Sequence, residues 1–118
     1  MIRTVMAVSL IATTFVASGQ EYKPMESRYM LYAGGIGDPV APSKSDASMS
    51  LEITGKAAED LFGQIGPDVR DACGTEEGSR FRSRGNGSIS CQYTRQGGYV
   101  CYLGVDLKKG KLVTASVC

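Results

Sequence analysis

The sequence predicts an α+β fold in which one main helix packs on a curved antiparallel sheet of about four to five strands. Three observations predict it. Residues 48–53 alternate between polar and apolar, residues 55–65 repeat apolar side chains at helical spacing, and residues 88–118 contain three strand-like runs separated by short turns. Strands joined by tight turns pair with their neighbours, so the sheet is expected to be antiparallel with the helix on one face.

The first 19 residues have the pattern of a secretion signal. Arg3 supplies an early positive charge, an uncharged and mostly apolar run spans residues 4–16, and small residues follow at 17–19. The apolar run is shorter than the ~20 residues that a membrane span needs. No cysteine stands at the expected cleavage site, so no lipid anchor is expected. We therefore predict a periplasmic or secreted protein whose mature chain begins near residue 20.

Residues 20–47 are predicted to form an N-terminal strand and a flexible loop. The strand is expected at 28–33, where two tyrosines favour extended backbone. It ends at a glycine-rich turn over residues 34–37. The following segment contains Pro39, Pro42 and several serines, a composition typical of a surface loop.

Residues 48–118 are predicted to form a disulfide-stapled α+β core. The strand at 48–53 places its apolar side chains on one face. The helix follows Thr54, which can act as its N-cap, and ends before the Gly66-Pro67 pair. Its apolar positions are Ala57, Ala58, Leu61, Phe62 and Ile65.

The C-terminal half is predicted to form an antiparallel meander. A short strand is expected at 80–82 within a polar loop, followed by strands at 88–94, 99–107 and 111–118. The Asn86-Gly87 pair is a strong turn signal. A two-residue turn at Lys109-Gly110 is expected to join the last two strands.

The chain contains four cysteines, and the even number in a small secreted protein predicts two disulfides. They are Cys73, Cys91, Cys101 and Cys118. A two-residue turn at 109–110 would place Cys101 opposite Cys118 at a non-hydrogen-bonded pair, where Cα atoms lie roughly 4.5 Å apart. The favoured pairing is therefore Cys101–Cys118 with Cys73–Cys91, and the two other pairings remain open.

The residue types present exclude several kinds of catalysis. The chain has no histidine, so it lacks a Ser-His-Asp or Cys-His arrangement, and it has no Cys-x-x-Cys pair for zinc. Oxidised cysteines are not nucleophiles. The remaining enzymatic option is Asp106 with a loop carboxylate. We predict that the protein is not an enzyme and that it takes no metal or cofactor.

The charges of the mature chain are divided unevenly. Residues 20–79 contain 11 acidic and 5 basic side chains, whereas residues 80–118 contain 7 basic side chains and a single acid, Asp106. One interpretation is internal complementarity or an ordinary solvated surface. The other is a basic face that meets an anionic partner such as a cell-wall polymer, a lipid head group or an acidic protein. Neither nucleic acid nor a membrane span is expected.

The best candidate contact surface combines arginines and aromatic residues, which interfaces concentrate. The alternation over residues 80–84 can place three guanidinium groups on one side of an extended segment. A solvated basic loop is the alternative. Asp106 is either a surface strand residue or a polar anchor in a binding groove. The predicted binding residues are Arg80, Phe81, Arg82, Arg84, Tyr93, Arg95, Tyr99 and Asp106.

Residues 53–62, the cysteines at 73 and 91, and residues 99–111 resemble a group of small secreted, periplasmic bacterial proteins of unassigned function. The shared features are a Gly-x-x-Ala helix and a Tyr-x-Cys strand that runs into an Asp-Leu-x-x-Gly turn. The resemblance covers residues 48–118 and implies no catalytic residue. The layout is also similar, at the level of fold, to envelope inhibitor proteins with a helix on a disulfide-pinned sheet.

These observations predict a non-enzymatic protein-binding module in the periplasm or outside the cell. Its most concrete form is an inhibitor or immunity protein against a hydrolase or toxin. The alternative is a small envelope structural protein that binds a cell-wall or outer-membrane polymer. An enzyme is the third possibility.

Overall fold

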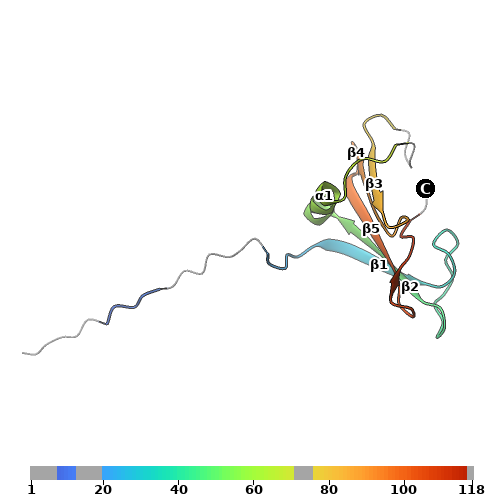
Figure 1. Ribbon diagram of the computed structural model, residues 1–118, viewed down its shortest axis with the longest axis horizontal. Helices are drawn as coiled ribbons and strands as arrows, with labels where there is room; N and C mark the ends of the chain where they lie inside the picture. Colours follow the sequence, from blue (N-terminus) through green and yellow to red (C-terminus); the bar gives the residue numbers. More distant parts are fainter. Residues whose placement is uncertain (1–7, 13–19, 71–75, 117–118) are drawn as a thin grey trace, which may run out of the picture.

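Six antiparallel strands and one helix make up the domain in the computed structural model, which describes residues 8–12, 20–70 and 76–116. Figure 1 shows α1 against one face of the sheet. The elements in chain order are β1 (Glu26–Tyr32), β2 (Ser48–Thr54), α1 (Gly55–Gln64), β3 (Arg80–Arg84), β4 (Ile89–Thr94), β5 (Gly98–Asp106) and β6 (Lys111–Leu112). The predicted α+β class is confirmed, and the described sheet has one or two strands more than expected.

The sheet has the strand order β1-β2-β5-β4-β3, and every pair is antiparallel. The short strand β6 pairs with the last two residues of β5, beyond the point at which β4 pairing stops. The longest strand, β5, is therefore the centre of the sheet, while β1 and β3 form its two edges.

The helix covers the face that carries the apolar residues of β2. The buried core consists of Ile53 from β2, Ala58 and Phe62 from α1, and the two cysteines Cys91 and Cys101. The other predicted apolar positions of α1 pack around this core, so the helical spacing in the sequence is confirmed. Thr54 is the N-cap residue as predicted, although its side chain makes no capping hydrogen bond.

The opposite face of the sheet is covered by the chain's C-terminal segment. Ser50 is buried and donates a hydrogen bond of 3.0 Å to the carbonyl oxygen of Ala115, while the hydroxyls of Ser90 and Ser116 lie 3.1 Å apart. A Cβ at Gly104 would collide with the Val113 carbonyl oxygen, so glycine is required where the segment crosses β5. Small side chains thus allow a close approach of backbone to sheet.

The last hairpin differs from the prediction. Val105 pairs with Leu112 and Asp106 pairs with Lys111, so the connecting turn has four residues rather than two. The Asp106 carboxylate explains the longer turn, because it accepts hydrogen bonds of 2.9 and 3.0 Å from the backbone N–H groups of Lys108 and Lys109. Of the predicted strand at 111–118, residues 111–112 form β6 and residues 113–116 form no strand, since the chain crosses the sheet there.

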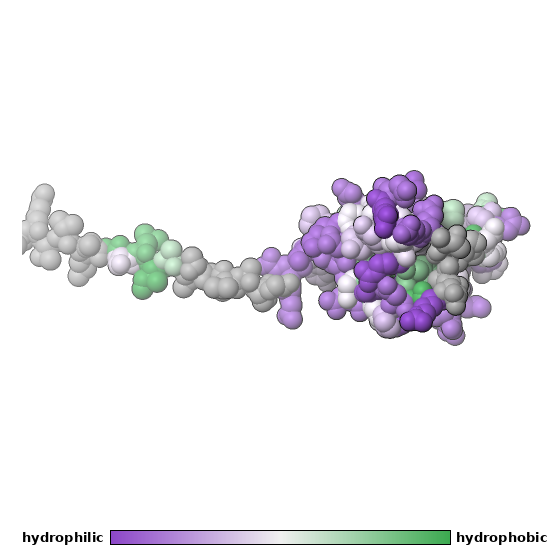
Figure 2. Space-filling view, turned by 90° about the horizontal axis from the view of Figure 1, so that it is seen from above, coloured by the Kyte–Doolittle hydropathy of each residue, from purple (hydrophilic) through white to green (hydrophobic). Residues whose placement is uncertain are grey.

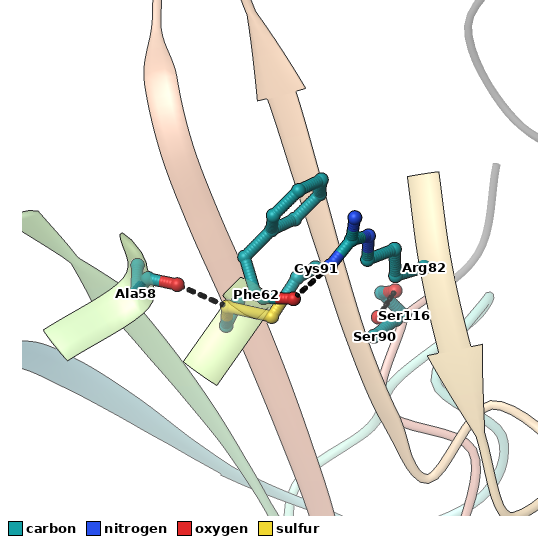
Figure 3. The surroundings of a disulfide bond; sticks show 7 residues. Ala58, Phe62, Arg82, Ser90, Cys91 and Ser116 are labelled. Carbon is teal, nitrogen blue, oxygen red and sulfur yellow. Dashed lines mark hydrogen bonds between the residues drawn. A yellow bond between two sulfur atoms is a disulfide. The ribbon is translucent and has the colours of Figure 1, made fainter. Parts of the chain in front are cut away.

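The favoured disulfide pairing is wrong. Cys91 and Cys101 form a disulfide with a Cα–Cα distance of 4.0 Å, which excludes both Cys73–Cys91 and Cys101–Cys118. The two residues face each other on β4 and β5 and belong to the core with Ala58 and Phe62 of α1. Figure 3 shows the disulfide beside these two residues of the helix. The prediction failed because it depended on the two-residue turn. The cysteines at 73 and 118 lie outside the described residues.

Little of the predicted secretion signal is described. Residues 8–12 adopt neither helix nor strand, and the rest of the segment 1–19 lies outside the described residues. Within the described parts of the chain, no helix has both the length and the apolar character needed to cross a bilayer. The face of the domain seen in Figure 2 is mainly hydrophilic.

Candidate functional site

The predicted arginine surface lies beside α1 and contacts it. Strand alternation places Arg80, Arg82 and Arg84 on one face of β3, as the sequence predicted. Two of these guanidinium groups lie over the Phe62 ring, Arg82 at 4.1 Å and Arg80 at 5.1 Å from its centroid. Cations over an aromatic face are attracted to it, so these side chains stabilise the helix from one side.

Asp68 accepts hydrogen bonds from two of the arginines. Its carboxylate oxygens lie 2.8 and 3.1 Å from Arg80 nitrogens and 2.8 Å from the Nε of Arg82. These bonds, with Arg80 first, lower the pKa of Asp68 to about 2. The acidic and basic parts of the sequence therefore meet here, which supports internal complementarity at this position.

The other donors of these arginines bind backbone carbonyls in the last turn of α1 and just after it. Arg82 donates a hydrogen bond of 2.6 Å to the carbonyl oxygen of Phe62, and Arg84 donates to the carbonyl oxygen of Gly66. Carbonyls in the last turn of a helix have no partner within the helix. The basic strand therefore caps the helix end, and these guanidinium groups already have partners inside the domain.

The two predicted tyrosines extend the same cluster. The Tyr99 ring lies 5.2 Å from the Phe62 ring and 4.8 Å from that of Tyr93, which is its cross-strand neighbour. Both tyrosines are half-buried and pack against the core. The structure thus brings together four of the eight predicted binding residues, Arg80, Arg82, Tyr93 and Tyr99, around one buried ring.

The remaining predicted residues lie elsewhere. Phe81 lies on the opposite face of β3, because it alternates with the arginines. Arg95 lies against Gly78 at the turn between β4 and β5. Asp106 stands at the far end of β5, and the hydrogen bonds from Lys109 and Lys108 lower its pKa. The role of Asp106 that the structure shows is to cap the turn.

A pocket of about 460 Å³ lies on the sheet face opposite α1. This volume is within the range of small ligand sites, ~300–1,000 Å³. Its walls come from β1, β2, β5, the loop after β1 and the C-terminal segment. The lining residues are Arg28, Tyr29, Met30, Ile36, Ser50, Glu52, Tyr102, Ala115 and Ser116.

Three polar side chains in this pocket are bonded to one another. The Glu52 carboxylate accepts hydrogen bonds of 2.6 and 3.1 Å from Arg28 and one of 3.2 Å from the Tyr102 hydroxyl. They come from adjacent strands, since Arg28 pairs with Glu52 and Glu52 pairs with Tyr102 in the sheet register. Arg28 is largely exposed, whereas the Glu52 side chain is 24% exposed.

The electrostatics of this trio favour fixed charges at neutral pH. The hydrogen bond from Arg28 lowers the pKa of Glu52, and the same bond raises the pKa of Arg28. Burial, reinforced by the nearby Glu52 charge, raises the pKa of Tyr102. A carboxylate with a lowered pKa is a weak general base, because acid–base catalysis works best with a pKa near the working pH. The trio is suited to binding.

No group of three or more histidine, cysteine, aspartate or glutamate side chains suited to a metal ion occurs among the described residues. Searches for similar proteins found no family model, no curated protein and no solved structure that matches the chain. The resemblance drawn from the sequence motifs therefore stays a prediction.

The pocket residues were not recognised from the sequence. Arg28 and Glu52 are 24 positions apart, and Glu52 and Tyr102 are 50 apart. Nothing in local periodicity shows that β2 inserts between β1 and β5. The available signal was the alternation of charged and polar residues on the side of β2 away from Ile53.

Proposed function

We propose that the protein is a non-enzymatic, periplasmic or secreted module that binds another protein. The pocket beside β1 receives an apolar side chain of that partner. A partner of the hydrolase or toxin type would make the module an inhibitor or an immunity protein. The observation that carries the proposal is the pocket itself, in which the charges of Arg28 and Glu52 neutralise each other.

The lining of the pocket supports an apolar ligand group. Met30 and Ile36 present apolar surface to it, and Met30 is 40% exposed. The Glu52 carboxylate and the Arg28 guanidinium neutralise each other at 2.6 Å, so an apolar group does not have to remove an unpaired charge from water. Methionine adapts its shape to irregular ligands, as binding surfaces often require.

The polar trio supports a specific orientation of the ligand. Arg28 uses its Nε and one terminal nitrogen for Glu52. Its other terminal nitrogen donates no hydrogen bond to the described residues and can bind a backbone carbonyl of a partner. An apolar pocket with a few fixed polar groups is the usual composition of a recognition site.

The test is affinity capture with a matched pair of variants. The purified, oxidised protein is immobilised, exposed to envelope and culture-supernatant extracts, and the retained proteins are identified by mass spectrometry. Met30→Glu places a charge in the pocket and is expected to abolish retention of a stoichiometric partner. Leu31→Glu is the control, because Leu31 is similarly exposed at 46% and lies on the other face of β1.

Equal retention by both variants would remove the pocket from the proposal. Recovery of wall or membrane polymer alone, lost as salt rises, would favour the structural alternative, because polyanion binding is screened whereas a packed interface persists.

A further inference from the structure

The outer edge of β1 is uncovered in the described structure. β1 pairs with β2 on one side and ends the strand order on the other. Except for the buried Tyr32, its residues are exposed on both faces, including Tyr29 at 69%, Met30 at 40% and Leu31 at 46%. A strand in this position presents backbone N–H and C=O groups that are ready to pair with another chain.

β1 also lacks several of the features that protect edge strands. It has seven residues and contains neither proline nor lysine, and its charged residues are Glu26 and Arg28. Its register with β2 is continuous from Glu26 to Tyr32, so no bulge bends it. The edge at β3 is different, because the Val69 N–H donates a hydrogen bond of 2.7 Å to the Phe81 carbonyl oxygen there.

We propose that β1 pairs with β1 of a second copy of this chain. An antiparallel edge is self-complementary about a two-fold axis, which is the commonest symmetry of homodimers. Pairing along the whole strand places the axis at Tyr29, the central residue of the seven. The two Tyr29 side chains then face each other, and aromatic cross-strand pairs are favourable.

The charges on β1 are compatible with this register. Arg28 faces Met30 of the second copy, and Glu26 faces Tyr32, so no like charges stand directly opposite each other. The two Arg28 side chains lie diagonally, and each is neutralised by its own Glu52 at 2.6 Å. A register that centred on Arg28 would instead set two guanidinium groups face to face, which disfavours it.

The pairing has a consequence for the pocket, and this step rests on the proposed function. A two-fold axis perpendicular to the sheet keeps corresponding faces on the same side. Both pockets therefore open on one face of a continuous twelve-stranded sheet, with Met30 of each copy beside Arg28 of the other. The dimer presents two adjacent binding sites.

The test is the molar mass of the purified, oxidised protein across a dilution series, measured by light scattering and sedimentation equilibrium. We expect twice the chain mass at the concentrated end and dissociation on dilution. Tyr29→Lys sets two ammonium groups opposite each other and is expected to give single chains at every concentration. Leu112→Lys is the control, because Leu112 is 60% exposed and lies on β6.

A wild-type protein of single-chain mass throughout the series would overturn the proposal, as would an unchanged mass for folded Tyr29→Lys. Circular dichroism of each variant confirms that it is folded. Neither Met30→Glu nor Leu31→Glu sets like charges opposite each other in this register. A failure of partner capture is therefore distinguishable from a failure of dimerisation.

Discussion

The two edges of the sheet differ in what covers them. At the closed edge, β3 is bonded to residues 62–69 through three arginines, one aspartate and a backbone hydrogen bond. At the open edge, β1 has one neighbouring strand, and most of its side chains are exposed. The arginines of β3, which resemble an interface in composition, thus bind other parts of the domain. The accessible surface is supplied by β1, which the sequence did not distinguish as a binding surface.

The closed edge depends most on Phe62, which is 3% exposed and carries both arginines over its ring. Phe62→Ala leaves a cavity in the core and removes that platform, so we expect a loss of about 3–5 kcal/mol in the free energy of unfolding. Met30→Ala at the open edge is the comparison, and it is expected to cost much less because Met30 is 40% exposed. Urea unfolding of both variants provides the measurement.

The Cys91–Cys101 disulfide joins β4 to β5 beneath α1. Replacing both cysteines with alanine is expected to cost roughly 2–3 kcal/mol, because the bond closes a loop of only about ten residues. Tryptic digestion without reduction checks the pairing first. Since Arg95 lies between the two cysteines, residues 85–95 and 96–108 should appear as one linked species. Linkage of residues 85–95 to 71–80 would contradict the Cys91–Cys101 pairing.

Arg82 at the closed edge and Arg28 at the open edge each bind a carboxylate, so substitutions of the two can be compared directly. Arg82 is only 15% exposed in its side chain and also donates to the Phe62 carbonyl. Arg82→Ala removes the charged donor of that carbonyl and leaves Asp68 with Arg80 as its charged donor, so we expect a loss of about 1–3 kcal/mol in the free energy of unfolding. A loss no larger than that of Arg28→Ala would show that the closed edge does not depend on Arg82.

Acid should weaken the closed edge through Asp68. Its pKa in the folded protein is about 2, lower than the ~3.9 of an unperturbed aspartate. A carboxylate with a lowered folded pKa stabilises the fold above its unfolded pKa, and this contribution is lost as pH falls toward 2. Thermal midpoints measured between about pH 5 and 2 should therefore fall less steeply for Asp68→Asn than for the wild type.

The matched control for this measurement is Asp38→Asn, since Asp38 is exposed and makes no ion pair with the described residues. Its curve should keep the wild-type shape. An Asp68→Asn curve parallel to the wild type over the whole range would show that the two arginines do not stabilise the folded protein through this carboxylate.

Local patterns in the sequence predicted the helix and strands. The side-chain contacts between them depend on residues far apart in the sequence and were not predicted. The apolar spacing of α1 was sufficient to identify Ala58 and Phe62 as buried. The partners of the arginines were not predictable, because Asp68 lies 12 residues from Arg80 and the Phe62 carbonyl 20 from Arg82. The burial of Ser50 depends on Ala115, 65 residues away.

The disulfide prediction was wrong because the turn between β5 and β6 was assigned the wrong length. One carboxylate, that of Asp106, binds two backbone N–H groups and lengthens the turn from two residues to four. In an antiparallel pair the register follows from the turn. The register on which the Cys101–Cys118 prediction depended is therefore not the observed one, and the partner of Cys101 is Cys91 on β4.

The smallest effect on stability is expected at the open edge. The Arg28 side chain is 80% exposed, and exposed ion pairs contribute little because water and salt screen them. Arg28→Ala should therefore leave the unfolding midpoint unchanged within error, although its guanidinium makes two hydrogen bonds to Glu52. The same variant removes the Arg28 donors that we propose bind the partner, and it is expected to weaken partner capture. A large drop in the midpoint would show that the trio of Arg28, Glu52 and Tyr102 supports the fold, and the contrast between the two edges would then be lost.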